Sequence, residues 1–258
     1  METFEIKTVT QKESKDDLRL KKIKLYIDFA EAVQKKTGES LADTLYKFTP
    51  LQWEFQRYSP DPDLAVWNEF VTGIGKKPLL DWVLEFSKRR DDPKLAKNSD
   101  KKGKENTPKR CFMYDVFGED VDIHFDNNDK SGFGPLSKER MKERRAELKE
   151  LFTIIKFKHP KAKEVHGRSW LYNLESYKRL FPESYAKSVK PYKGKFANGN
   201  GLWGQLSDRE GNLKQDLVTE LFENLEKVDA NDIPSAFKYQ RMTASAPIED
   251  FYKEYGVE

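Results

Sequence analysis

Apolar residues recur every three or four positions through most of the first 90 residues, which is the spacing of amphipathic helices. One helix is expected over residues 16–35, where the apolar positions are Leu20, Ile23, Ile27, Ala30 and Val33. Further helices are expected over 40–46, after Thr49-Pro50, after Asp61-Pro62 and over 78–87, since serine, threonine, aspartate and proline favour helix starts. The pattern therefore predicts an all-α bundle over residues 12–88.

After Arg110 the apolar period changes from about 3.6 residues to 2, which is typical of β-strands. Residues 111–117 and 121–125 predict a hairpin with a turn at 118–120, and a long helix is expected from Ser137 to about Phe157. A third strand is expected over 164–173, a short helix over 174–181, an extended segment over 185–196, and C-terminal helices near 217–228 and 250–255. This order predicts an α+β domain with a crossover helix over 111–258.

Lys88–Arg110 separates the two halves and reads KRRDDPKLAKNSDKKGKENTPKR, with ten basic and four acidic residues. Its net charge of +6 exceeds the +3 of the whole chain, and Leu95 and Ala96 are its only aliphatic side chains apart from two prolines. We interpret residues 89–110 as a charged linker. Nucleic-acid binding is the alternative, but nucleic acid is not the expected partner because no aromatic residue is interleaved to stack on a base.

Composition narrows the class of protein. Hydrophobic residues make up 37% of the 258 and aromatic residues 13%, which predicts a folded chain. No apolar run approaches the roughly 18–20 residues that span a bilayer, and the N-terminus has no secretory apolar region, so we expect a cytoplasmic protein without membrane partners. A single cysteine, Cys111, excludes an internal disulfide and a thiolate-rich zinc site.

A glycine-containing loop precedes the long predicted helix. Such a loop presents backbone N–H groups and the positive helix end to an anion. It contains Lys130, Ser131, Gly132, Phe133 and Gly134. The loop is either a phosphate cradle or simply a tight turn, and Pro135 removes one of its donors.

The sequence VDIHFDNNDKSGFGPLS, the helix after it and RSWLYN together resemble the GNAT-like C-terminal domain of bacterial acyltransferase-type proteins with a helical N-terminal domain. The landmarks are Ile123-His124, Gly134-Pro135-Leu136 and Ser169-Trp170-Leu171, within a resemblance that covers about Cys111–Ser207. The resemblance implies that acyl-CoA is the donor, with its pyrophosphate at the glycine loop and its pantetheine arm between the strand ending at Phe125 and the strand over 164–172. Asn173 matches a polar position after that second strand.

The same resemblance implies transfer of an acyl group to an amine of a small molecule or peptide. Tyr177 or Tyr185 would protonate the departing thiolate as general acid. His124 and Asp126 are the candidates for the general base, because alternate residues of one strand share a face. No metal is expected.

Two alternatives stay open. Aligning Gly132 and Gly134 with the family loop puts Asp129 at its basic position, where a carboxylate repels a pyrophosphate; together with Pro135 this favours a non-catalytic α+β scaffold that binds a protein or small ligand. His124-x-Asp126 with His166 has the ligand types of a two-histidine, one-carboxylate iron site. The helix predicted between them argues against the all-β fold of the oxygenases that use such sites.

Overall fold

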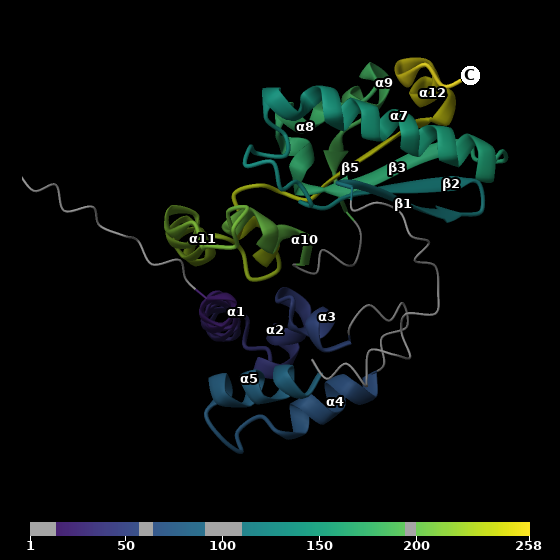
Figure 1. Ribbon diagram of the computed structural model, residues 1–258. Coiled ribbons are helices and arrows are strands. Elements are labelled where there is room, and N and C mark those ends of the chain that lie inside the picture. The colour runs from purple at the N-terminus through teal and green to yellow at the C-terminus, as the bar shows by residue number, and fades with distance from the viewer. Residues whose placement is uncertain (1–13, 57–63, 91–109, 194–199) are drawn as a thin grey trace, which may run out of the picture.

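The computed structural model describes residues 14–56, 64–90, 110–193 and 200–258 (Figure 1). It has the expected α+β class, with one mixed five-stranded sheet and many helices. Its buried side chains form two hydrophobic cores, one among helices and one between the sheet and the helices that cover it. The predicted linker lies outside the described residues except at its two ends, and the start signal at Asp61-Pro62 also lies outside them.

The N-terminal helices expected from the sequence are present. They are α1 (Lys15–Thr37), α2 (Leu41–Phe48), α3 (Leu51–Gln56), α4 (Leu64–Thr72) and α5 (Leu79–Arg90). Capping residues determine where such helices begin and end, as α1 shows. Ser14 and Asp17 form a capping box at the start of α1, and Gly38 ends that helix in the left-handed conformation with φ 73°.

A later segment of the chain completes the helical core. It comprises α10 (Asn200–Trp203), η3 (Gly204–Leu206), α11 (Gln215–Lys227) and η4 (Ile233–Ala236). Trp203 packs edge-to-face on Phe29 of α1, with ring centroids 5.2 Å apart, and its indole N–H donates to the Phe48 carbonyl at 2.9 Å. The helical core therefore draws on residues 202–237, which the sequence had placed with the sheet.

The sheet has the order β1-β2-β3-β5-β4. Its strands are β1 (Phe112–Phe117), β2 (Asp120–Phe125), β3 (Glu164–Ser169), β4 (Lys190–Pro191) and β5 (Met242–Pro247). The β1–β2 hairpin is antiparallel as expected, β2 and β3 are parallel, and β5 pairs antiparallel with both β3 and β4. The chain thus leaves the sheet after β4, contributes to the helical core, and returns as β5.

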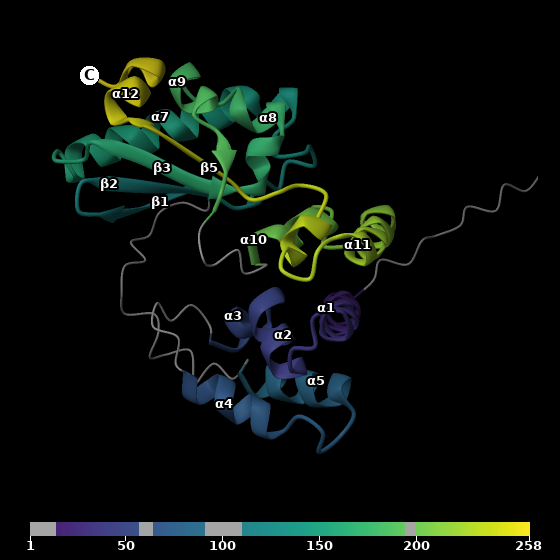
Figure 2. The ribbon, with the colours of Figure 1, turned by 180° about the vertical axis from the view of Figure 1, so that it is seen from behind.

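Helices cover one face of this sheet in both views (Figures 1 and 2). They are α7 (Met141–Lys158), which follows η1 (Lys138–Arg140), then α8 (Glu175–Lys178) after η2 (Trp170–Asn173), α9 (Glu183–Lys187) and α12 (Ile248–Tyr255). Val121, Ile123 and Val165 are buried on this covered face. The alternate positions of β1–β3 point to the opposite face, where Met113 and Phe117 are exposed. Among the described residues, the helices that pack on the sheet lie on the covered side, so we call this opposite side the uncovered face.

Two expectations about strands are wrong, and one strand was not predicted. The third strand ends at Ser169 and not at 173, because the Ser169 hydroxyl accepts the Leu171 N–H at 3.1 Å and starts η2. The segment expected to be extended over 185–196 is helical through Lys187, and only Lys190–Pro191 form a strand among its described residues. Strand β5, which lies between β3 and β4, had no counterpart in the sequence prediction.

Candidate functional site

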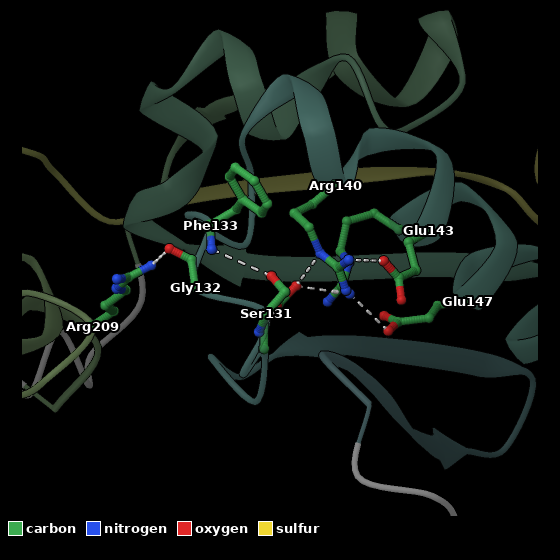
Figure 3. A network of polar contacts seen from close by, with 9 residues as sticks. Ser131, Gly132, Phe133, Arg140, Glu143, Glu147 and Arg209 are labelled. Carbon is green, nitrogen blue, oxygen red and sulfur yellow. Dashed lines mark hydrogen bonds and ion pairs between the residues drawn. The ribbon is translucent and has the colours of Figure 1, made fainter.

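The glycine loop lies between β2 and η1, and the carboxylate of Asp129 fills its interior. The Asp129 side chain has no exposed area. Its Oδ1 accepts the backbone N–H of Ser131 at 2.7 Å, while the Ser131 hydroxyl oxygen accepts the N–H of Phe133 at 3.3 Å (Figure 3). Two of the amides that could have held a phosphate therefore bind side chains of the loop itself.

Two arginines close this arrangement from the helix side. The other Asp129 oxygen lies 2.6 Å from Nε of Arg140 and 3.2 Å from Nη2 of Arg144. Arg140 also pairs with Glu143, and Arg144 lies 3.1 Å from Glu147 (Figure 3). Two cations thus contact three carboxylates. We call these five side chains the Asp129 cluster; its charge is negative, so it repels a phosphate.

The cluster fixes the ionisation of its central carboxylate. Burial alone would raise the pKa of Asp129, but hydrogen bonds from Ser131 and Arg140 together with the charge of Arg140 hold it at about 2. Burial raises the pKa of Glu147, although the nearby Arg144 opposes that rise. Arg144 is buried, and its Nε and Nη1 have no hydrogen-bond partner among the described residues.

The residues expected to bind the cofactor do not gather around an open cradle. Lys130, Ser131, Gly132, Phe133 and Gly134 are exposed and follow one another around the outside of the loop. The Gly132 carbonyl accepts a hydrogen bond from Arg209, from the segment between η3 and α11. Asn173 instead joins two turns, because its amide donates to the carbonyls of Trp170 at 2.7 Å and Gln240 at 2.8 Å.

Both candidate acid tyrosines are interior residues. Tyr185 shares a 2.6 Å hydrogen bond with the hydroxyl of Tyr172, and Tyr177 packs edge-to-face against the Tyr172 ring at 5.1 Å. Burial raises the pKa of all three phenols well above the ordinary value of 10. Tyr172, which the sequence prediction had assigned to a strand, is thus the centre of a buried tyrosine cluster that stays protonated at neutral pH.

This tyrosine cluster lies directly behind Gly167 of β3. A Cβ at Gly167 would lie 2.0 Å from the Tyr172 hydroxyl oxygen and 2.3 Å from that of Tyr185. Gly167 is also the last β3 residue paired with β2, opposite Ile123, although β2 continues to Phe125 and β3 to Ser169. The two parallel strands therefore stop pairing at the point where the tyrosine hydroxyls approach the backbone.

The proposed base residues do not form a pair with each other. His124 on the uncovered face has Nε2 3.0 Å from Oδ2 of Asp115 on β1, whereas Asp126 lies beyond the end of β2. His166 lies 3.4 Å from Asp120. In the described part of the chain no group of three His, Cys, Asp or Glu side chains could hold a metal ion, so the three iron-ligand candidates do not form a site.

Comparisons with known proteins give no relative. No family model, curated protein or solved structure matches the chain. Within the described residues, no helix has both the length and the apolar character that crossing a bilayer requires.

Proposed function

We propose that the protein is a non-catalytic α+β scaffold that binds a protein or a small ligand. The observation that supports this choice over the transferase is the position of Asp129. Its carboxylate lies in the loop where the resemblance puts the pyrophosphate of acyl-CoA, and it takes up the Ser131 amide and both arginines. The Asp129 carboxylate thus occupies the place of an anion in the loop before η1.

Binding a diphosphate in the loop would require the Asp129 carboxylate to move away from its arginine partners. Removing one partner from a buried ion pair costs about 3–5 kcal/mol. At about 1.4 kcal/mol for each factor of ten, that cost lowers affinity by roughly two to almost four orders of magnitude. The displaced Asp129 carboxylate would then remain close to the incoming phosphates and repel them. Acyl-CoA is therefore a poor fit to this loop.

An acyl-CoA-dependent N-acyltransferase is the second candidate, and one observation favours it. The parallel strands β2 and β3 stop pairing at Ile123 and Gly167, and the hydroxyls of Tyr172 and Tyr185 lie behind that point. A thioester lying between the separated strands would be near these phenols. In this candidate Tyr177 or Tyr185 keeps the acid role and His124 or Asp126 the base role.

Thermal unfolding with acetyl-CoA decides between the two candidates. We expect no change in Tm at 1 mM acetyl-CoA, because the loop is occupied by Asp129. A specific ligand at 100 times its Kd stabilises the folded state by about 2.7 kcal/mol, which is an easily measured rise.

A Gly134→Trp variant is the matched control for that experiment. The nearest atom to a Cβ at Gly134 is 3.9 Å away, so a large side chain there blocks the loop without disturbing the core. A rise in Tm that Gly134→Trp abolishes would contradict the scaffold proposal and support the transferase. For the transferase, Tyr177→Phe would then lower turnover without weakening acetyl-CoA binding.

A further inference from the structure

A groove with a volume of about 1170 Å³ lies between α1 and α11, which are neighbours in both views (Figures 1 and 2). Its described lining residues all belong to these two helices or to the segment just before α11. The helices run in the same direction: an added Cβ at Gly211 would lie 3.8 Å from Leu18, and at the other end Lys36 donates to the Glu226 carbonyl at 3.1 Å. The groove therefore follows both helices, and we call it the α1–α11 groove.

Apolar side chains from both helices line this groove. Leu18 and Leu25 of α1 are two helical turns apart, and Val218 and Phe222 of α11 are one turn apart. Leu213, just before α11, adds a fifth apolar side chain. Leu25 and Val218 are buried, whereas the other three are only partly buried and can still contact a ligand.

The dimensions of the groove match a helix of about three turns. Its lining residues run over 18–28 on α1 and over 215–226 on α11, which corresponds to about 15 Å of helix on each side. Small-molecule pockets have volumes of about 300–1,000 Å³, and this groove exceeds that range. An amphipathic helix that lies in such a groove buries side chains at positions i, i+3 or i+4, and i+7. The α1–α11 groove therefore suits a helix better than a small molecule.

The charge of the groove indicates which kind of helix it favours. Its charged lining residues are two lysines and four carboxylates, Lys21, Lys24, Asp28, Glu210, Glu223 and Glu226, so it is negative even when both lysines are counted in full. Lys24 and Asp28 neutralise each other at 2.6 Å, and Arg209 pairs with Glu210. Glu223 and Glu226 are exposed and form no ion pair with any described residue. The α11 side of the groove therefore attracts basic side chains and repels acidic ones.

We propose that the α1–α11 groove binds a basic amphipathic helix of a partner protein. This inference rests on the proposed function and names the partner and the surface that holds it. Apolar side chains of the bound helix would pack on Val218 and Phe222, and its lysine or arginine side chains would face Glu223 and Glu226. Residues 1–13 of this chain are a competing occupant, but they contain three acidic and two basic residues and match the charge less well.

Fluorescence anisotropy of the full chain with a labelled 14-residue peptide of leucine and lysine tests this proposal. The leucines of the peptide are placed at helical spacing, so that they share one face of a helix. Two control peptides change one property each: one alternates leucine and lysine, and the other has glutamate in place of every lysine. We expect both controls to bind at least about tenfold more weakly than the helical lysine peptide.

Thr219→Trp is the variant that blocks the groove. Thr219 lines it and is exposed, so the larger side chain occupies the groove without removing a core contact. This variant should weaken binding of the lysine peptide by about tenfold or more. Thr153→Trp is the matched control, because Thr153 is an exposed threonine of α7 outside the groove, and it should bind as the wild type does. Urea unfolding of each variant separates lost binding from lost folding.

Charge reversal tests the electrostatic part of the proposal. The double variant Glu223→Lys and Glu226→Lys should bind the lysine peptide about tenfold more weakly than the wild type does, and the glutamate peptide more tightly. The double variant Glu183→Lys and Glu249→Lys makes the same change in net charge at exposed positions of α9 and α12, outside the groove. It should leave the binding of both peptides as in the wild type.

Several outcomes would overturn the proposal. Equal binding of the helical peptide and its alternating isomer, or unchanged binding in Thr219→Trp, removes the helix site. Tighter binding of the glutamate peptide than of the lysine peptide by the wild type contradicts a basic partner. Tenfold tighter binding of the lysine peptide after deletion of residues 1–13 assigns the groove to that segment. A dimer in sedimentation equilibrium that Thr219→Trp dissociates assigns it to a second copy of the chain.

The acetyl-CoA experiment keeps this result separate from the proposed function. If acetyl-CoA raises Tm and the lysine peptide also binds in the groove, the helix site stands but the scaffold proposal fails. If neither binds, the helix inference fails, while the objection to acyl-CoA that Asp129 raises still stands.

Discussion

Replacing Gly167 by alanine is expected to destabilise the protein by about 3–5 kcal/mol, as the sum of core overpacking and of a broken buried hydrogen bond. The added Cβ would lie 2.0 Å from the hydroxyl oxygen of Tyr172 and 2.3 Å from that of Tyr185. Those two oxygens share a 2.6 Å hydrogen bond in a buried site, so moving them apart leaves buried polar groups unpaired. Urea unfolding followed by circular dichroism measures the change.

Two further variants make this test specific. Gly134→Ala should change stability by less than about 0.5 kcal/mol, since that glycine is exposed and nothing lies closer than 3.9 Å to its added Cβ. Adding Tyr172→Phe and Tyr185→Phe to Gly167→Ala removes both clashing oxygens and should recover part of the loss. Recovery remains partial because the ring carbon Cζ of Tyr172 is 3.0 Å from the added Cβ. A Gly167→Ala protein as stable as the wild type would contradict this description of the tyrosine cluster.

Local sequence signals predicted the N-terminal helices and the first hairpin. A capping serine such as Ser14 and an ending glycine such as Gly38 act within one turn, so their effect can be read without knowing the rest of the fold. The β1–β2 hairpin is equally local, because Gly118 with φ 65° permits a tight turn between adjacent strands.

The interior strand β5 could not be predicted in the same way. Its buried positions are Ala244 and Ala246, which are too small to give a strong alternation of apolar and polar residues. Met242–Pro247 is a strand because β3 and β4 supply hydrogen-bonding partners on both sides. Its pairing with β3 joins residues about 80 positions apart, and no local pattern contains that information.

The helical core shows the same limit. The apolar stripe of α11, with Val218, Leu221 and Leu225, predicts an amphipathic helix but does not say which partner it covers. It packs with Phe29 and Trp203 in the helical core, while the flanking β4 and β5 belong to the sheet. Neither the composition nor the spacing of apolar residues shows that the segment between two neighbouring strands packs in a different core.

For the candidate site, the sequence identified the unusual residue but not its role. Alignment of the glycines places Asp129 at the loop position where the family has a basic side chain. Arg140, Arg144 and Glu147 follow at intervals of four and three residues, and this spacing predicts that they share one helix face. That the face turns toward Asp129 depends on the direction in which the loop enters α7, which only the folded chain determines.

Replacing Asp129 by asparagine is expected to destabilise the protein by about 3–5 kcal/mol, because it leaves Arg140 and Arg144 with one fewer buried counter-charge. Asparagine keeps the size of the side chain and an oxygen for the Ser131 N–H, so the loss reports charge more than shape. Asp126→Asn is the matched control, since Asp126 is exposed three residues earlier and should change stability by less than about 0.5 kcal/mol.

The stability that the Asp129 carboxylate contributes should also depend on pH. The folded-state pKa of Asp129 is about 2, below the ordinary value of 3.8, so the ionised carboxylate stabilises the folded protein above about pH 4. That stabilisation is lost as pH falls from 4 through 2. Asp129→Asn should lack this part of the acid dependence, so its stability difference from the wild type should shrink at low pH. Parallel pH profiles for the two proteins in urea unfolding would mean that the Asp129 carboxylate does not hold the loop closed.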